Sequence, residues 1–208
     1  MLRALRRAQR LRQLGRRIAH SDCVCGLSPC LAPHCFAAAE AWGAWTGSFT
    51  PDDRSLAPYQ GTPESVAAAL LTLSRLQPGE TFVDLGSGDG RILLHAVEHY
   101  DAGSVVGYEL DPVVHALAEE HVRARLGGSP LLQRVRLVCG DAREADLRHA
   151  HVVALYLLAS GHAALKPLME AQLGRGTRVV AHGWPVPGWE ANQELTSFSG
   201  ARLFLYER

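Results

Sequence analysis

The sequence of 208 residues lacks several features that common classes of protein require. Its 21 basic residues include a single lysine, Lys166, so catalysis through a lysine Schiff base has no strong candidate. No Ser-His-Asp set is indicated, and there is no internal repeat or low-complexity tract. A helix that spans a bilayer needs about 20 apolar residues. The apolar run at 35–45 is shorter and contains Glu40, so it can lie on a membrane surface or pack on the domain through its tryptophans, but it cannot be a transmembrane span.

The chain as a whole has a net charge of zero, with 21 basic and 21 acidic residues. The balance is uneven, because residues 1–21 contain seven arginines and no acidic residue. The remainder has 14 basic residues against 21 acidic ones, a net charge of −7. A domain that binds nucleic acid needs a basic face, so the acidic body argues against a nucleic-acid partner.

The arginine-rich start is predicted to be a separate element. Leu11, Leu14 and Ile18 fall on one side of a helical wheel, and arginines fall on another. An amphipathic, Arg-rich and acid-free N-terminus is typical of a mitochondrial transit peptide. The alternative is a basic tail that is disordered or touches anionic lipid, and the protein would then be cytoplasmic. We therefore predict that residues 1–22 are a targeting segment or a basic tail.

Cysteine is scarce, and most of it is clustered. Four of the five cysteines lie within residues 23–57, namely Cys23, Cys25, Cys30 and Cys35. Their spacing lacks the paired C-x2-C knuckles of common zinc sites. Free thiols in a flexible linker and a redox disulfide are the alternatives to a metal site. We interpret 23–57 as a Cys-containing linker and assign no metal ligand.

The most informative part of the chain is FVDLGSGDGR at 82–91, followed by VVGYELDP at 105–112. An apolar run ends in Asp84, a glycine-rich loop follows, and a second apolar run ends in Glu109. This is the spacing of a strand, a nucleotide-binding loop, a helix and a second strand. The alternative is an ordinary strand-turn-helix in which the glycines serve only the turn.

The exact loop favours one nucleoside cofactor. It reads G-x-G-x-G, and Arg91 stands where a dinucleotide fingerprint has its third glycine. Asp84 and Asp89 suit a ligand that carries an ammonium and a sulfonium better than one that carries phosphates. The loop resembles the first motif of class I methyltransferases that depend on S-adenosyl-L-methionine (SAM). The resemblance implies SAM as the cofactor.

From residue 58 onward the hydrophobic pattern alternates between helix and strand. Thr62 is expected to cap a helix that begins at Pro63 and ends at Pro78, and Asp111 is expected to cap a helix that begins at Pro112. Two further helices are expected at 90–99 and 162–173. Strands are expected at 81–85, 104–109, 135–139, 152–157, 178–182, 194–198 and 201–206.

These elements predict an α/β fold. Parallel strands with helical crossovers need helices on both faces of the sheet, and the last two strands are close enough in sequence to form an antiparallel hairpin. The expected fold is a mostly parallel seven-stranded sheet with a C-terminal antiparallel hairpin, the Rossmann-like arrangement of the class I methyltransferases. We predict that this domain occupies residues 58–208.

The carboxyl ends of the predicted strands supply the cofactor site. Asp84 can hold the glycine loop or, through water, the methionyl ammonium, and Glu109 can accept from both ribose hydroxyls. Asp141 can accept from the adenine amino group, or alternatively can cap the short segment that follows it. The predicted cofactor-binding residues are Tyr59, Thr62, Asp84, Gly86, Ser87, Gly88, Glu109, Asp141 and Ala142.

Six segments restrict the resemblance to one small family among the class I methyltransferases. They are PYQGTPESV, VDLGSGDGRI, VVGYELDP, GDAREADL, VVALYLL and TRVVAHGWPVPGW, which occur in this order between residues 58 and 189. The set resembles a small methyltransferase family that includes the mitochondrial protein-lysine methyltransferases of the adenine nucleotide translocase and of the ATP synthase c subunit, together with bacterial relatives. Such relatives usually carry an apolar membrane anchor ahead of the domain, where this chain has only the run at 35–45. The resemblance implies a protein substrate, including inner-membrane proteins of mitochondria.

The segment after the fourth predicted strand bears on the substrate. Methyltransferases of amide or exocyclic base nitrogens usually have an Asn/Asp-Pro-Pro-Tyr/Phe segment there, and this chain has Leu-Tyr-Leu-Leu at 155–158. A lysine amine needs mainly alignment and desolvation, which lowers its pKa. The polar aromatic residues best placed to shape such a channel are Tyr59, Tyr156, His182 and Trp184. For Tyr156 and Trp184, simple core packing is the alternative.

The sequence therefore predicts a SAM-dependent N-methyltransferase whose substrate is a protein lysine. One alternative is a small-molecule methyltransferase, which would be expected to carry a large apolar lid between the late strands. The other is a non-catalytic assembly subunit with this fold, which would be expected to lose the glycine loop or the ribose acid. Mitochondria are the predicted location, with the cytoplasm as the alternative.

Overall fold

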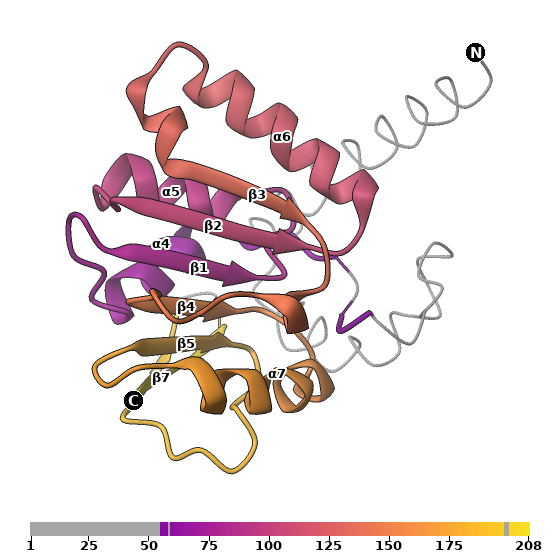
Figure 1. Cartoon of the computed structure of the whole chain (residues 1–208). Coiled ribbons are helices and arrows are strands. Elements are labelled where there is room, and N and C mark those ends of the chain that lie inside the picture. Colours follow the sequence, from indigo (N-terminus) through magenta and orange to yellow (C-terminus); the bar gives the residue numbers. More distant parts are fainter. Residues whose placement is uncertain (1–54, 58, 198–199) are drawn as a thin grey trace.

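The structure is a computed structural model that describes residues 55–57, 59–197 and 200–208 (Figure 1). The predicted targeting segment, the four clustered cysteines and the apolar run at 35–45 lie outside these residues. Within the described ranges, no helix is long and apolar enough to cross a membrane.

The sheet has seven strands, as the sequence predicts, in the order β3-β2-β1-β4-β5-β7-β6 (Figure 1). The first five strands pair in parallel, and β7 pairs antiparallel with both β5 and β6. The order reverses direction at β1, because β2 lies on one side of it and β4 on the other. In chain order the strands are β1 (Thr81–Leu85), β2 (Ser104–Glu109), β3 (Val135–Cys139), β4 (Val152–Leu155), β5 (Arg178–His182), β6 (Gln193–Thr196) and β7 (Arg202–Glu207).

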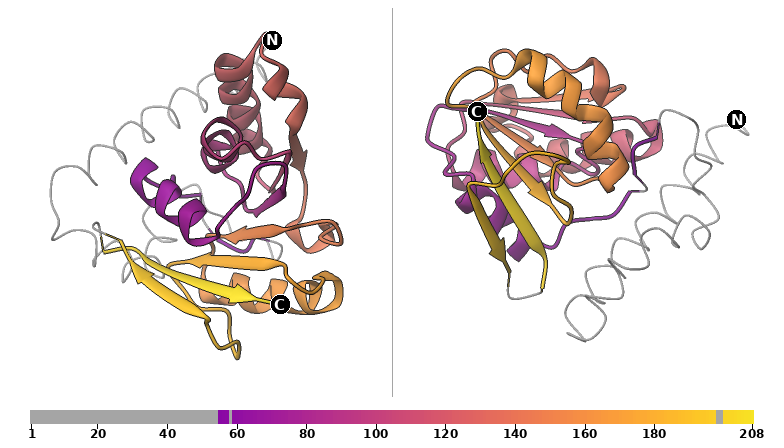
Figure 2. Two further views of the ribbon diagram at one scale, coloured as in Figure 1. Left: turned by 90° about the vertical axis from the view of Figure 1, so that its left-hand side faces the viewer. Right: turned by 90° about the horizontal axis from the view of Figure 1, so that it is seen from below.

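The helices lie on both faces of the sheet, which confirms the predicted fold class (Figure 2). Successive strand residues point to opposite faces, so Phe82 packs with α4, α5 and α6, whereas Val83 packs with α7. Two apolar cores result, one on each face. The helices are α4 (Glu64–Leu73), α5 (Arg91–His99), α6 (Pro112–Leu126) and α7 (Ala159–Gln172), with short 3-10 turns η1 (Pro130–Arg134) and η2 (Ala142–Glu144).

The predicted cap at Thr62 is wrong. The N-cap of α4 is Pro63, whose carbonyl oxygen accepts from the amides of Val66 and Ala67, and no side chain caps this helix. Thr62 is buried at 3% exposure. The helix also ends earlier than expected, at Leu73, because Arg75 takes a left-handed conformation with a φ of 53°.

Two boundaries around the fourth strand also differ from the prediction. The parallel register ends where Leu85 of β1 faces Leu155, so β4 stops two residues before the expected end. Helix α7 begins at Ala159 rather than at 162. The two residues released from the strand, Tyr156 and Leu157, line a cavity instead of extending the sheet. The predicted Asp111 cap is confirmed, because its carboxylate accepts from the amide of Val113 at 2.7 Å.

Candidate functional site

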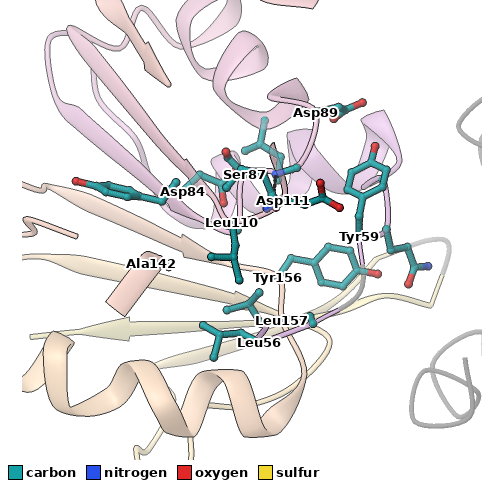
Figure 3. Close-up of a pocket in the computed structure, with 18 of the residues that line it drawn as sticks. Leu56, Tyr59, Asp84, Ser87, Asp89, Leu110, Asp111, Ala142, Tyr156 and Leu157 are labelled. Atoms are coloured by element: carbon teal, nitrogen blue, oxygen red, sulfur yellow. Dashed lines mark hydrogen bonds between the residues drawn. The ribbon is translucent and has the colours of Figure 1, made fainter. Parts of the chain in front are cut away.

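A cavity of about 430 Å³ opens at the carboxyl edge of the parallel strands (Figure 3). Loops after β1, β2, β3 and β4 line it, and the segment that precedes α4 closes one side. This is where an open parallel sheet binds its ligands, next to the reversal of strand order at β1. The charged residues of the lining are Asp84, Asp89, Arg91, Glu109, Asp111 and Asp141.

The glycine loop between β1 and α5 forms one wall of the cavity. Gly86 and Gly88 have φ values of 91° and 57°, in the left-handed region that favours glycine. A Cβ atom on Gly88 would lie 2.7 Å from Cε2 of Tyr59, so the tyrosine ring rests directly on the loop. A Cβ atom on Gly86 would lie 2.8 Å from Cδ2 of Leu157. Both glycines are therefore required by backbone conformation and by close neighbours.

Glu109 ends β2 and braces the loop from the opposite side. Its Oε2 accepts from the amide of Gly88 at 2.9 Å, and its Oε1 accepts from the amide of Asp111 at 2.8 Å. Burial raises the pKa of Glu109, and these two amide donors, together with the amide of Leu110, counteract the rise. Each carboxylate oxygen can accept two hydrogen bonds. The carboxylate has about four acceptor positions in all, so it retains capacity to accept from a diol such as that of a ribose.

Asp84 and Ser87 offer buried polar atoms to a ligand (Figure 3). Among the described residues, neither Asp84 Oδ2 nor Ser87 Oγ has a hydrogen-bond partner. Burial raises the pKa of Asp84 to about 7, and the carboxylates of Glu109 and Asp89 contribute to the rise. A buried carboxylate without a partner is costly. The site therefore fits the ammonium group of SAM, which would give Asp84 a cationic neighbour.

SAM binding is expected to depend on pH through Asp84. With a pKa of about 7 in the free protein, Asp84 is mostly protonated below neutrality and must lose that proton to face a cation. The affinity for SAM should therefore rise by up to about tenfold per pH unit between pH 5.5 and 7, with proton release on binding. Calorimetry in buffers of different ionisation enthalpy measures this release. Asp84→Asn should abolish the rise of SAM affinity with pH. An unchanged pH dependence in this variant would show that Asp84 does not face the ammonium group.

Asp141 takes the capping role that the sequence left open as an alternative. Its Oδ1 accepts from the amide of Arg143 at 2.9 Å, and its two oxygens also accept from the Arg143 guanidinium. Asp141 and Ala142 both line the cavity. An adenine contact through Asp141 stays a prediction, and it would require the carboxylate to share its acceptor positions with Arg143.

Arg91 is the lining residue whose contacts the sequence did not predict. Its guanidinium donates to both oxygens of Asp89, at 2.8 Å from Nη2 to Oδ2 and 3.0 Å from Nε to Oδ1. Its Nη1 also donates to the carbonyl oxygen of Thr62 at 2.9 Å. The only sequence signal was the replacement of the third glycine of the dinucleotide pattern by arginine.

The four predicted channel residues do not all reach the cavity. Tyr59 and Tyr156 line it (Figure 3). His182 is buried at 1% exposure and stacks on the Tyr156 ring, with ring centroids 3.8 Å apart, so it lies behind the tyrosine. Burial lowers the pKa of His182 to about 3, and the neighbouring His162 contributes. Trp184 is half-buried and is not among the described residues that line the cavity.

Comparison with known proteins gives a consistent set of similarities. Residues 84–193 match the model of a family described as the ANTKMT methyltransferase domain. A protein-lysine N-methyltransferase of Saccharolobus islandicus is 32% identical over 66% of this chain and 83% of that protein. The mouse adenine nucleotide translocase lysine N-methyltransferase is 37% identical over 64% of this chain, which spans only 56% of the mouse protein. Among solved structures, an RNA methyltransferase of Salinibacter ruber in complex with S-adenosyl-L-homocysteine superposes with a TM-score of 0.66 and 32% identity, covering 71% of this chain and 93% of that one.

Proposed function

Because this chain belongs to the ANTKMT methyltransferase family and is a SAM-dependent methyltransferase, we propose that it methylates the side-chain amine of a protein lysine. The observation that carries the choice of lysine is the charge of the cavity. Five carboxylates and one arginine line it, and the arginine is paired with Asp89. A net negative cavity attracts a cationic side chain and repels an anionic one.

The residues of the cavity have separate roles in this proposal. Asp84 and Ser87 would hold the methionyl end of SAM, and Glu109 would hold the ribose. When bound, SAM would supply a sulfonium methyl group: the lone pair of an uncharged amine would form the new N–C bond as the S–CH3 bond breaks, and S-adenosyl-L-homocysteine would leave. Tyr59 and Tyr156 exclude water from the incoming amine, and desolvation lowers its pKa. Because Asp89 is paired with Arg91 and Asp141 with Arg143, these carboxylates favour the charged amine less than free carboxylates would.

Other substrates receive less support from the site. An RNA substrate is suggested by the description of the Salinibacter ruber protein, but the carboxylates of this cavity would repel phosphates. A small-molecule methyltransferase would be expected to carry a lid between the late strands, whereas residues 183–192 alone join β5 to β6. A non-catalytic assembly role is disfavoured because the glycine loop and Glu109 are intact and line the cavity together.

The substrate proposal is tested by labelling. The purified chain and SAM with a labelled methyl group are incubated with mitochondrial fractions and, separately, with total RNA. We expect label in protein, with methylated lysine in the acid hydrolysate and no label when Glu109→Ala replaces the native chain. Label confined to RNA, or to protein residues other than lysine, would contradict the proposal.

We also propose that the protein acts in mitochondria, on a substrate of the kind named for the mouse relative, the adenine nucleotide translocase. The support is the acid-free segment with seven arginines at residues 1–21. A fluorescent reporter fused after residues 1–40 is expected to enter mitochondria. The matched control replaces four of the arginines by glutamine and should stay in the cytosol. A diffuse signal from the unmodified fusion would leave only the basic-tail interpretation.

A further inference from the structure

An arginine side chain links the segment that carries Tyr59 to the glycine loop. Arg91 lies at the first position of α5, and one edge of its guanidinium is held by Asp89 of the loop. Its Nη1 reaches out of the loop to the carbonyl oxygen of Thr62 at 2.9 Å. The Asp89 side chain is only 3% exposed, so the ion pair that orients the guanidinium is shielded from solvent.

The backbone on the other side of this contact is packed just as closely. A Cβ atom on Gly61 would lie 2.9 Å from Nη2 of Arg91, so the chain passes directly against the guanidinium. Two residues earlier, the Tyr59 ring rests on Gly88 of the same loop. Burial and the carboxylate of Asp89 raise the pKa of the Tyr59 hydroxyl, and the Arg91 guanidinium counteracts the rise.

A lysine cannot reproduce this arrangement. The guanidinium has a planar set of five N–H donors, which here serve a carboxylate on one edge and a carbonyl on another. An ammonium at the same position keeps the charge opposite Asp89 but has a compact head on a flexible stem. Substitution by lysine therefore separates the geometric role of Arg91 from its charge, and it does not leave Asp89 as a buried unpaired charge.

We propose that Arg91 is a positioning residue for methyl transfer: by joining Asp89 of the glycine loop to Thr62, it holds the Tyr59 ring over the cofactor cavity. Arg91 itself acts only through Tyr59 in this inference. The inference rests on SAM-dependent methyl transfer but not on the identity of the acceptor as lysine.

The first test needs no acceptor. Amide hydrogen exchange of residues 59–62 is measured in the native chain, in Arg91→Lys and in Arg148→Lys, with and without SAM. Arg148 forms the same kind of pair with Asp146 two residues earlier, but its side chain is 70% exposed and it does not line the cavity. We expect faster exchange at 59–62 in Arg91→Lys alone, with a thermal midpoint close to that of the control. Unchanged exchange at 59–62 would overturn the inference.

The second test is a double-mutant cycle with Tyr59→Ala. Turnover at saturating SAM is measured on whichever acceptor the labelling experiment identifies. Arg91→Lys is expected to reduce turnover about tenfold, less than the roughly 100-fold that a 1 Å misplacement of an aligning group can cost, while SAM affinity stays close to that of the native chain. In the Tyr59→Ala background the same substitution should have no further effect on turnover. Additive losses would overturn the inference, because Arg91 would then act independently of Tyr59. If the acceptor proves not to be lysine, the proposed substrate fails but both readouts still apply.

Discussion

Replacement of Glu109 by alanine is expected to weaken SAM binding by about 2 to 4 kcal/mol, which corresponds to roughly 30- to 1,000-fold in Kd. The carboxylate would form two charge-assisted hydrogen bonds to the ribose hydroxyls. It also accepts hydrogen bonds from the amides of Gly88 and Asp111, so its removal takes away a hydrogen bond that orders the glycine loop. Loss of ligand contacts and loss of loop order both act in the same direction. Calorimetry on the purified chain measures the effect.

Two further variants separate these contributions. Glu109→Gln retains one carbonyl acceptor of similar size but no charge, so its loss of affinity should be smaller than that of Glu109→Ala. Glu120→Ala removes an exposed carboxylate from α6, outside the cavity, and should bind SAM as the native chain does. A folded Glu109→Ala variant with native affinity for SAM would show that Glu109 does not hold the ribose.

The fold and the positions of Asp84 and Glu109 could be predicted from the sequence for one physical reason. In a parallel sheet the carboxyl ends of the strands meet at one edge, so an acidic residue at the end of each apolar run must lie near the others. The hydrophobic pattern locates the ends of β1, β2 and β3, although it places the end of β4 two residues too late. The structure confirms the consequence, because both carboxylates line one cavity with Asp141, which follows β3.

Other features depend on contacts between segments that are distant in sequence. The sequence predicts a helix cap at Thr62 because Pro63 and Glu64 follow it, yet its carbonyl oxygen accepts from Arg91 and its side chain is buried. His182 ends β5, so the sequence predicts that it lies in the channel. Because β4 ends early, the Tyr156 ring instead stacks on His182 and separates it from the cavity. The local sequence carries no signal for either pairing, since each depends on how two loops pack against each other.

The second large effect is expected at Tyr59. Its ring covers Gly88 and closes one side of the cavity together with the segment ahead of α4 (Figure 3). An alanine at this position would let water into the cavity and would remove the side chain that packs against the incoming amine. Tyr59→Ala should therefore reduce turnover at saturating SAM by about 100-fold. This loss should exceed whatever loss of SAM affinity accompanies it.

The hydroxyl and the ring of Tyr59 have separable consequences. Tyr59→Phe keeps the ring on Gly88 and removes a buried hydroxyl beside Asp89 and Arg91, so turnover should fall much less than in Tyr59→Ala. If the ring acts by alignment, the loss in Tyr59→Ala appears in turnover and persists at any SAM concentration. If it acts only by contact with SAM, saturation restores the native rate. Native turnover by Tyr59→Ala at saturating SAM would therefore reduce Tyr59 to a packing residue, and Arg91 would have no side chain through which to position the reaction.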